Sequence, residues 1–271
     1  MNFIRILALG LLTLLGCSCG RKAEPQTLSG QAMGTTWKLA WRGGSVDGLG
    51  DQVSSVIEKW EAVLSHWRTD SDLTRFNQGQ PATPDLQRVI DLAEEMQTAS
   101  HGAFDFHLLK QSGDFGFGPA GTGIDLSAIG KGFAVDRVGE RLRELGITEF
   151  VFELGGEVLA GDGEWEVGIE EPDPALRVIA RTVKLKQQGL ATSGNYRQFR
   201  PVAGGLASHI IDPRTQKPVI RPPCSVSVVA ADCATADAWA TALFVLGRDA
   251  AFPSGLQVTW TDGGDSTSHT P

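Results

Sequence analysis

The sequence predicts an α+β fold, in which a mixed β-sheet core is flanked by helices. Apolar residues recur at helical spacing in four separate segments, whereas strand-like segments follow one another in the second half instead of alternating strictly with helices. The composition, with 41% hydrophobic and 21% charged residues, is that of a folded globular protein. A chain of 271 residues can bury a full core, and we expect one domain over residues 29–262.

The predicted helices cover residues 51–67, 85–100, 128–145 and 235–246. In the first, apolar side chains from Val53 to Trp67 recur every three or four residues and form one face. The second is preceded by Thr83 and Pro84, a capping residue and a favoured first helical residue. The third and fourth end at Gly146 and Gly247, typical C-terminal caps.

The predicted strands cover residues 149–154, 165–169, 178–185, 225–230 and 256–260. Between the second and third helices, residues 101–124 are rich in glycine and are expected to be irregular. The tail, residues 263–271, is expected to be loose.

The N-terminus has the pattern of an export signal. Arg5 precedes an apolar run of about ten residues, too short to span a bilayer as a helix but suited to a signal peptide. The run ends at Cys17 in a sequence that resembles a bacterial lipobox, in which the cysteine is lipidated. We therefore expect a signal peptide over residues 1–16, a tether over 17–28, and a lipid-anchored protein facing the periplasm or the cell exterior. The alternatives are lipidation at Cys19 and an ordinary secretory signal cleaved near Gly20.

The two remaining cysteines, Cys224 and Cys233, flank the predicted strand 225–230. Extended chain of that length holds its ends roughly 25 Å apart, whereas a disulfide requires Cα atoms within about 7 Å. We expect two buried thiols and no bridge between them.

The formal charge of −8, without basic clusters, makes nucleic acid an unexpected partner. An anionic ligand would need a metal, a lysine or a helix N-terminus to bind. Two glycine-rich segments match phosphate-binding motifs only superficially. Residues 116–121 have the dinucleotide-binding spacing but lack the flanking strand and helix, and Gly130-Lys131-Gly132 lacks the remainder of a P-loop.

Asp237 and Thr241 are four residues apart in the fourth predicted helix, so their side chains share one face. A carboxylate and a hydroxyl are hard oxygen ligands suited to Mg²⁺. The alternative is an aspartate that only offsets the helix dipole.

Asp125 and Lys131 lie where the chain enters the third predicted helix. A helix start with a nearby lysine can bind phosphate, and Asp125 can accept a hydrogen bond from a ligand. The alternative is simple capping by Asp125 or Ser127. His209, which precedes Asp212 in an expected loop, can act as a base near neutral pH or can be an ordinary loop histidine.

Taken together, these segments closely resemble the FAD:protein FMN transferase (ApbE) family of bacterial lipoproteins. Eight motifs occur in the family's order over roughly residues 30–250: Met33–Trp37, Ser65–Asn77, Gly102–Asp105, Asp125–Asp136, Leu154–Glu157, Ala191–Tyr196, His209–Pro213 and Ala236–Leu243.

The resemblance implies binding of FAD and Mg²⁺, transfer of FMN from FAD to a threonine or serine hydroxyl of a target protein, and release of AMP. The acceptor implied is a subunit of a membrane redox complex or a secreted flavoprotein. By position, the FAD contacts would be Met33, Trp67, Ala103, Phe104, Asp105, Asp125, Lys131 and His209. His209 would also be the catalytic base, and Mg²⁺ would be held by the Ala128 carbonyl with Asp237 and Thr241.

The chain departs from the family pattern at residues 106–110, at the expected mouth of the site, and its loop at 201–208 is short. Two other functions use the same residues. Water in place of the acceptor hydroxyl would make the chain an FAD pyrophosphatase that yields FMN and AMP, and a flavin-binding lipoprotein would perform no chemistry. The presence of Lys131, His209, Asp237 and Thr241 favours catalysis, because storage requires neither a base nor a metal.

Overall fold

The computed structural model describes residues 24–263 and 265–269. The predicted signal peptide, the lipobox with Cys17 and Cys19, and most of the predicted tether therefore lie outside the described residues. Within the described part, no helix has the length and apolar character needed to cross a bilayer.

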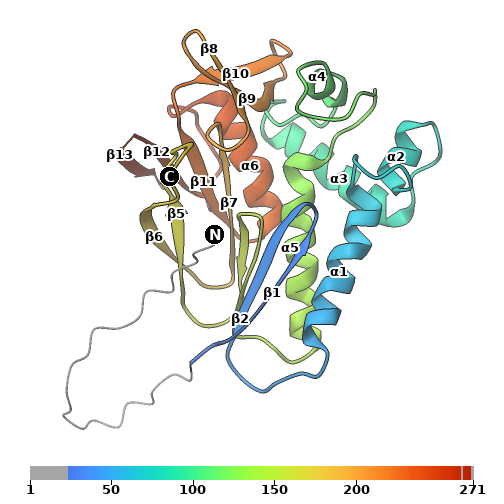
Figure 1. The fold of residues 1–271 in the computed structure, drawn as a ribbon, viewed down its shortest axis with the longest axis vertical. Helices are drawn as coiled ribbons and strands as arrows, with labels where there is room; N and C mark the ends of the chain where they lie inside the picture. Colours follow the sequence, from blue (N-terminus) through green and yellow to red (C-terminus); the bar gives the residue numbers. More distant parts are fainter. Residues whose placement is uncertain (1–23, 264, 270–271) are drawn as a thin grey trace.

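The core of the fold is an eight-stranded antiparallel sheet covered by helices on one face (Figure 1). In spatial order its strands are β1 (Gln26–Ala32), β2 (Thr35–Trp41), β3 (Phe150–Leu154), β4 (Glu157–Ala160), β7 (Gln188–Gly194), β11 (Ser225–Ala230), β12 (Gln257–Asp262) and β13 (Asp265–His269).

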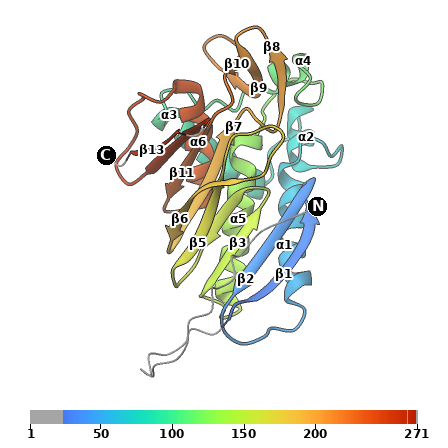
Figure 2. The same ribbon diagram turned by 60° about the vertical axis from the view of Figure 1, so that its left-hand side comes forward.

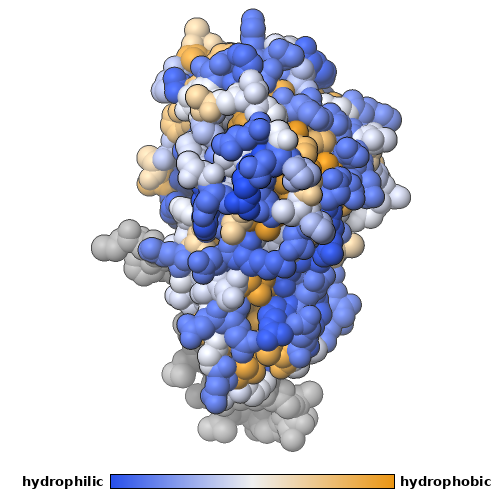
Figure 3. All heavy atoms as spheres, turned by 90° about the vertical axis from the view of Figure 1, so that its right-hand side faces the viewer, coloured by the Kyte–Doolittle hydropathy of each residue, from blue (hydrophilic) through white to orange (hydrophobic). Residues whose placement is uncertain are grey.

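Three long helices pack on one face of this sheet: α1 (Leu49–Leu64), α5 (Ser127–Glu144) and α6 (Cys233–Leu246). The α6 helix is buried along most of its length because it packs against β7, β11 and α5 together. A hairpin of β5 (Trp165–Glu170) and β6 (Ile179–Leu185) covers the other face, as Figure 2 shows. The helix side of the molecule presents a mostly hydrophilic surface with small apolar patches (Figure 3).

The remaining elements lie around one end of the helices: α2 (Asp72–Asn77), α3 (Pro84–Ala99), α4 (Leu109–Asp114), and a three-stranded antiparallel sheet of β8 (Phe199–Val202), β9 (Gly205–Asp212) and β10 (Lys217–Arg221). In this sheet β9 is the central strand.

The α+β prediction is confirmed, although the sheet expected to be mixed is antiparallel at each of its described pairings. The four long helices and five predicted strands form within three residues of their expected bounds. The first helix ends at Leu64 rather than Trp67, because the Ser65 hydroxyl accepts hydrogen bonds from the amides of Trp67 (3.2 Å) and Arg68 (3.3 Å) and turns the chain. Both Cys224 and Cys233 are free, and burial raises the pKa of both thiols.

Four local expectations are wrong. The tether does not extend to residue 28, because β1 begins at Gln26 and pairs with β2. The tail is not loose throughout, because β13 pairs with β12. The segment 101–124 is not irregular throughout, because it contains the short helix α4. His209 lies on strand β9 rather than in a loop, because β9 pairs with β8 on one side and with β10 on the other.

Candidate functional site

The centre of the candidate site is the contact between α5 and α6, which lie side by side in Figure 1. Gly132 makes this contact close: a Cβ atom there would lie 2.4 Å from the carbonyl oxygen of Cys233. Each helix also supplies one carboxylate that accepts hydrogen bonds from backbone amides of the other. Asp136 of α5 accepts hydrogen bonds from the amides of Cys233 (2.8 Å) and Ala234 (2.9 Å), and Asp237 of α6 accepts one from the amide of Gly132 (3.0 Å).

This link brings together the residues expected to hold a metal. In a regular helix the Gly132 amide donates to the carbonyl of Ala128, so its bond to Asp237 places that carboxylate beside the Ala128 turn. Thr241 lies one turn further along α6, and its hydroxyl oxygen lies 3.1 Å from the hydroxyl oxygen of Ser193. Since α6 begins at Cys233 and Asp237 is its fifth residue, Asp237 is not the first-turn dipole partner that the alternative interpretation required.

The electrostatics of Asp237 are suited to a cation. Its side chain is only 5% exposed, and burial raises its pKa above the ordinary range, an effect that Lys131 partly opposes and Glu157 reinforces. Within the described part of the chain, no three His, Cys, Asp or Glu side chains gather as metal ligands. A metal here would therefore be held by a mixed set of one carboxylate, one hydroxyl and one carbonyl, all of them hard oxygen donors.

Lys131 forms an ion pair with Glu157 at the start of β4. Burial disfavours the ammonium charge, but the carboxylates of Glu157 and Asp237 outweigh burial and raise the pKa of Lys131 above its ordinary value. The Oε2 atom of Glu157 is buried and has no hydrogen-bond partner among the described residues. From the sequence, Glu157 stands out only as part of the Leu154–Glu157 motif and not as a site residue; the available signal is an acidic residue at the start of an otherwise apolar strand.

Asp125 lies at the entrance to α5 and accepts two hydrogen bonds on one oxygen. The amide of Ser127 and Nδ1 of His66 each lie 2.9 Å from Oδ1. Burial works against the carboxylate charge, but the bond from His66 and its neighbours outweigh it and lower the pKa of Asp125. Asp125 thus accepts from the first amide of α5, as the capping interpretation expects, although the N-cap residue itself is Leu126. Its contact with His66 is visible only in the structure.

His209 approaches the same site from the three-stranded sheet. Its Nδ1 lies 3.2 Å from the carbonyl oxygen of Gln198, which can only accept, so Nδ1 carries the proton and Nε2 is left as an acceptor. Burial lowers the pKa of His209; Lys131 lowers it further, while Gln198 and Asp125 oppose the effect. These influences place His209 near both Lys131 and Asp125, and the neutral ring can accept a proton at neutral pH.

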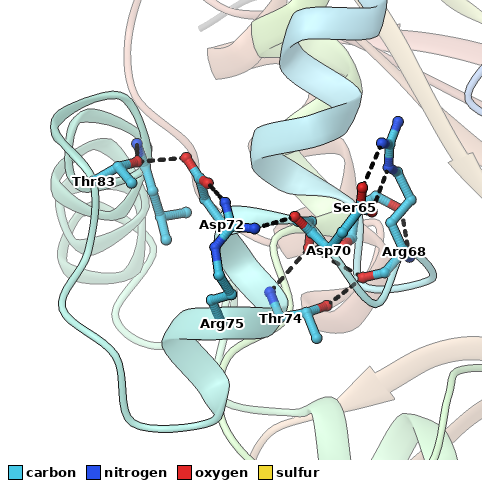
Figure 4. Close-up of polar contacts among 9 residues, drawn as sticks. Ser65, Arg68, Asp70, Asp72, Thr74, Arg75 and Thr83 are labelled. Atoms are coloured by element: carbon cyan, nitrogen blue, oxygen red, sulfur yellow. Dashed lines mark hydrogen bonds and ion pairs between the residues drawn. The ribbon is translucent and has the colours of Figure 1, made fainter.

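Trp67 and Met33 lie in turns at one end of the sheet and helices. The Trp67 side chain is 67% exposed, on a loop that internal hydrogen bonds hold in place (Figure 4). In that loop the Ser71 hydroxyl donates to the carbonyl of Ser65 (2.6 Å) and the Thr74 hydroxyl to that of Arg68 (2.7 Å). Met33 connects β1 to β2 with a positive φ of 49°, and its amide lies 3.3 Å from Oε2 of Glu61.

The predicted FAD contacts of residues 103–105 differ in exposure. Ala103 and Phe104 are buried in the main core, so their side chains pack against the protein. Asp105 is half-buried and accepts hydrogen bonds from Gln97 (3.0 Å) and from the amide of His107 (2.9 Å).

The comparisons with known proteins concern the family and the fold of the chain. A family model described as the ApbE family matches residues 33–122 and 109–254. The chain belongs to the ApbE family.

Curated relatives of this ApbE-family chain carry the name FAD:protein FMN transferase. The Vibrio cholerae relative is 32% identical over 92% of this chain and 88% of its own length, and the Haemophilus influenzae relative is 30% identical over 86% and 84%. The names of these relatives confirm the prediction of an enzyme of the transferase class.

Solved structures support the ApbE fold. The flavin transferase ApbE from Vibrio cholerae is 25% identical, with a TM-score of 0.75 over 91% of this chain and 96% of that one. The ApbE protein from Thermotoga maritima, 22% identical with a TM-score of 0.72 over 88% and 94%, shares the fold.

Proposed function

We propose that this chain transfers FMN from FAD to a threonine or serine hydroxyl of a target protein and releases AMP. One observation supports the proposal: Lys131, His209 and Asp237 come from separate parts of the sequence, and the charge of Lys131 acts on both of the others, with Thr241 one helical turn from Asp237 on α6. The names of the curated relatives support the choice of FAD as the donor.

The proposed reaction is a displacement at phosphorus. The acceptor oxygen forms a bond to the phosphorus of the FMN moiety, the pyrophosphate P–O bond breaks, and AMP leaves with the bonding electrons. His209 takes the hydroxyl proton on Nε2, and its bond to the Gln198 carbonyl keeps the ring oriented for this step. Lys131, held by Glu157, offsets the negative charge that grows on the leaving phosphate.

We propose Mg²⁺ as the metal of this site, with the Ala128 carbonyl, Asp237 and Thr241 as its ligands. The fit rests on the buried Asp237 carboxylate, whose raised pKa reflects a charge that the protein alone compensates poorly. When bound, the ion supplies charge neutralisation at the phosphates.

The exposed Trp67 indole is available to stack on the isoalloxazine ring, and Met33, Asp105 and Asp125 are the further proposed FAD contacts. Because the side chains of Ala103 and Phe104 are buried, their part in the FAD site would come from the backbone.

We also propose that the protein is lipid-anchored through Cys17, outside the cytoplasm, and acts on a redox protein there. Mass spectrometry of the N-terminal peptide from membrane-purified protein tests the anchor. A lipidated peptide beginning at Cys17 is expected, and an unmodified peptide beginning near Gly20 would contradict it.

The transfer itself is tested by the intact mass of a candidate acceptor domain incubated with this protein, FAD and Mg²⁺. We expect a gain of one FMN that disappears when the acceptor threonine is replaced, when EDTA is added, or with Asp237→Ala. Asp91→Ala, which alters an exposed aspartate on α3, serves as the matched control and should retain transfer. Release of AMP and free FMN without acceptor labelling would favour the pyrophosphatase, and FAD binding without any product would favour flavin storage.

A further inference from the structure

His66 forms a partly buried contact with Asp125 that the proposed mechanism does not use. Their side chains are only 10% and 11% exposed, and His66 Nδ1 lies 2.9 Å from Asp125 Oδ1. Because an ionised carboxylate only accepts hydrogen bonds, Nδ1 of His66 is the donor. The two residues lie 59 positions apart in sequence, just after α1 and just before α5, so the bond connects separate parts of the fold.

This contact fixes the orientation of Asp125. Asp125 Oδ1 accepts hydrogen bonds from two directions, from His66 Nδ1 and from the amide of Ser127. Together these two bonds fix the orientation of the carboxylate and therefore the direction of its second oxygen, Oδ2. A hydrogen bond to a charged acceptor in a buried position is worth more than an exposed one. The chain contains a second pair of the same type, His107 and Asp105, at 3.0 Å, but there the histidine side chain is 56% exposed.

His66 also contacts Trp67. Their rings meet edge to face, with centroids 5.1 Å apart and planes inclined by 68°. The Trp67 indole is otherwise largely open to solvent, so His66 is the aromatic neighbour that supports it. One side chain thus touches two residues that the proposed function places against FAD.

We propose that His66 is a positioning residue for FAD: its Nδ1–H holds Asp125 in the orientation that receives the ligand, and its ring supports Trp67. This inference rests on the proposed function, because it takes Asp125 and Trp67 as FAD contacts. It adds a residue whose role is to preorganise the cofactor end of the site rather than to touch reacting atoms.

The test uses three substitutions that separate the hydrogen bond from the volume of the ring. In His66→Asn the amide nitrogen can take the place of Nδ1, whereas in His66→Gln the amide lies one bond further out, near the position of Nε2. All three variants lack the imidazole ring, and His66→Ala also lacks a side-chain donor. For each variant of the full chain, the FAD dissociation constant is measured by flavin fluorescence, and the melting temperature is measured in the same buffer.

We expect His66→Ala and His66→Gln to weaken FAD binding by about 10-fold, and His66→Asn to remain within about 3-fold of the wild-type value. In an Asp125→Ala background, His66→Ala should weaken binding further by no more than about 3-fold, because the shared hydrogen bond is already absent. His101→Asn, at an exposed turn residue with a positive φ that asparagine tolerates, is the matched control and should leave binding unchanged.

Equal FAD affinity in the wild type and His66→Ala would overturn the inference while leaving the proposed function intact. Equal losses in His66→Asn and His66→Gln would also overturn it, because the position of the donor would then not matter. If the wild-type chain itself does not bind FAD, the proposed function fails, and the role of His66 fails with it.

Discussion

The α5–α6 contact and the three-stranded sheet hold opposite parts of the site by different means. At the α5–α6 contact, Asp136 and Asp237 accept backbone hydrogen bonds across two helices that touch at Gly132, and both carboxylates are buried. The sheet carries exposed apolar side chains, Val202 and Ile220. It is joined to the end of α6 partly through arginine bonds to the Val245 carbonyl, at 3.2 and 3.5 Å.

The two regions differ in whether a substitution changes stability together with activity or activity alone. The residues proposed to hold Mg²⁺ belong to the buried packing of two helices, so a change there alters the core and the site together. His209 lies half-buried on the smaller sheet, so its replacement removes a function while leaving the main core in place. The two regions should therefore respond differently to substitution.

Among substitutions that leave the main core in place, the largest expected effect on activity is at His209. His209→Asn keeps a donor for the Gln198 carbonyl but removes the base, and we expect transfer to fall by about 10²- to 10⁴-fold with little change in melting temperature. Because burial lowers the pKa of His209, the acidic limb of the wild-type rate profile should have its midpoint below pH 6.5. A limb centred well above that pH, or a variant with wild-type rate, would remove His209 from the role of base.

A loss of both stability and activity is expected at Gly132. Gly132→Ala places a Cβ 2.4 Å from the Cys233 carbonyl oxygen and forces α5 and α6 apart, which should cost about 1–3 kcal/mol in the free energy of unfolding and also reduce transfer. Gly130→Ala is the matched control on the same helix: its Cβ would meet only Leu64, at 3.5 Å, and should be neutral or stabilise by up to about 1 kcal/mol. Urea denaturation of both variants measures the contrast, and equal unfolding free energies would show that the helices do not require this close approach.

The pH dependence of stability should change at Asp136. Burial raises its pKa to about 7 in the folded chain, against an ordinary 3.8, so between these values the folded state binds more protons than the unfolded state. The contribution of Asp136 to the free energy of unfolding therefore falls as the pH rises from about 4 to about 7, by about 1.4 kcal/mol for each unit of pKa difference.

Asp136→Asn lacks this titration, so the wild type should lose stability relative to the variant as the pH rises through the same range. Urea denaturation of both chains at several pH values measures this difference. Parallel stability curves for the two proteins would exclude a raised pKa at Asp136.

The smallest effect is expected on the exposed face of the sheet. Arg200 lies over the Phe117 ring at 5.3 Å and donates to the Gly116 carbonyl at 3.4 Å. Arg200→Gln should change the free energy of unfolding by about 0.5 kcal/mol or less, since exposed contacts of this kind are weak. Thermal unfolding checks this expectation, and a loss as large as that of Gly132→Ala would remove the contrast between the two regions.

Local sequence patterns were sufficient for the four long helices. Thr83 and Pro84 begin α3 as predicted, and the apolar spacing of α1 and the terminal glycines of α5 and α6 located those helices. The local pattern did not predict β1, because most residues of this edge strand are polar. The Met33-Gly34 turn that joins β1 to β2 also lacks the usual hairpin residues. The local pattern also did not predict β13, which forms by pairing with the edge of β12.

By itself, the sequence determined the secondary structure with strong periodicity, the shared face of Asp237 and Thr241, and, through its ordered motifs, the resemblance to the ApbE family. Only the tertiary structure decided which side chains meet: Asp136 with the first amides of α6, Lys131 with Glu157, and His66 with Asp125. The physical reason is distance along the chain. Helical spacing is a local property, whereas burial, and the pKa shifts and hydrogen bonds that depend on it, arises from contacts between segments 26 to 105 residues apart.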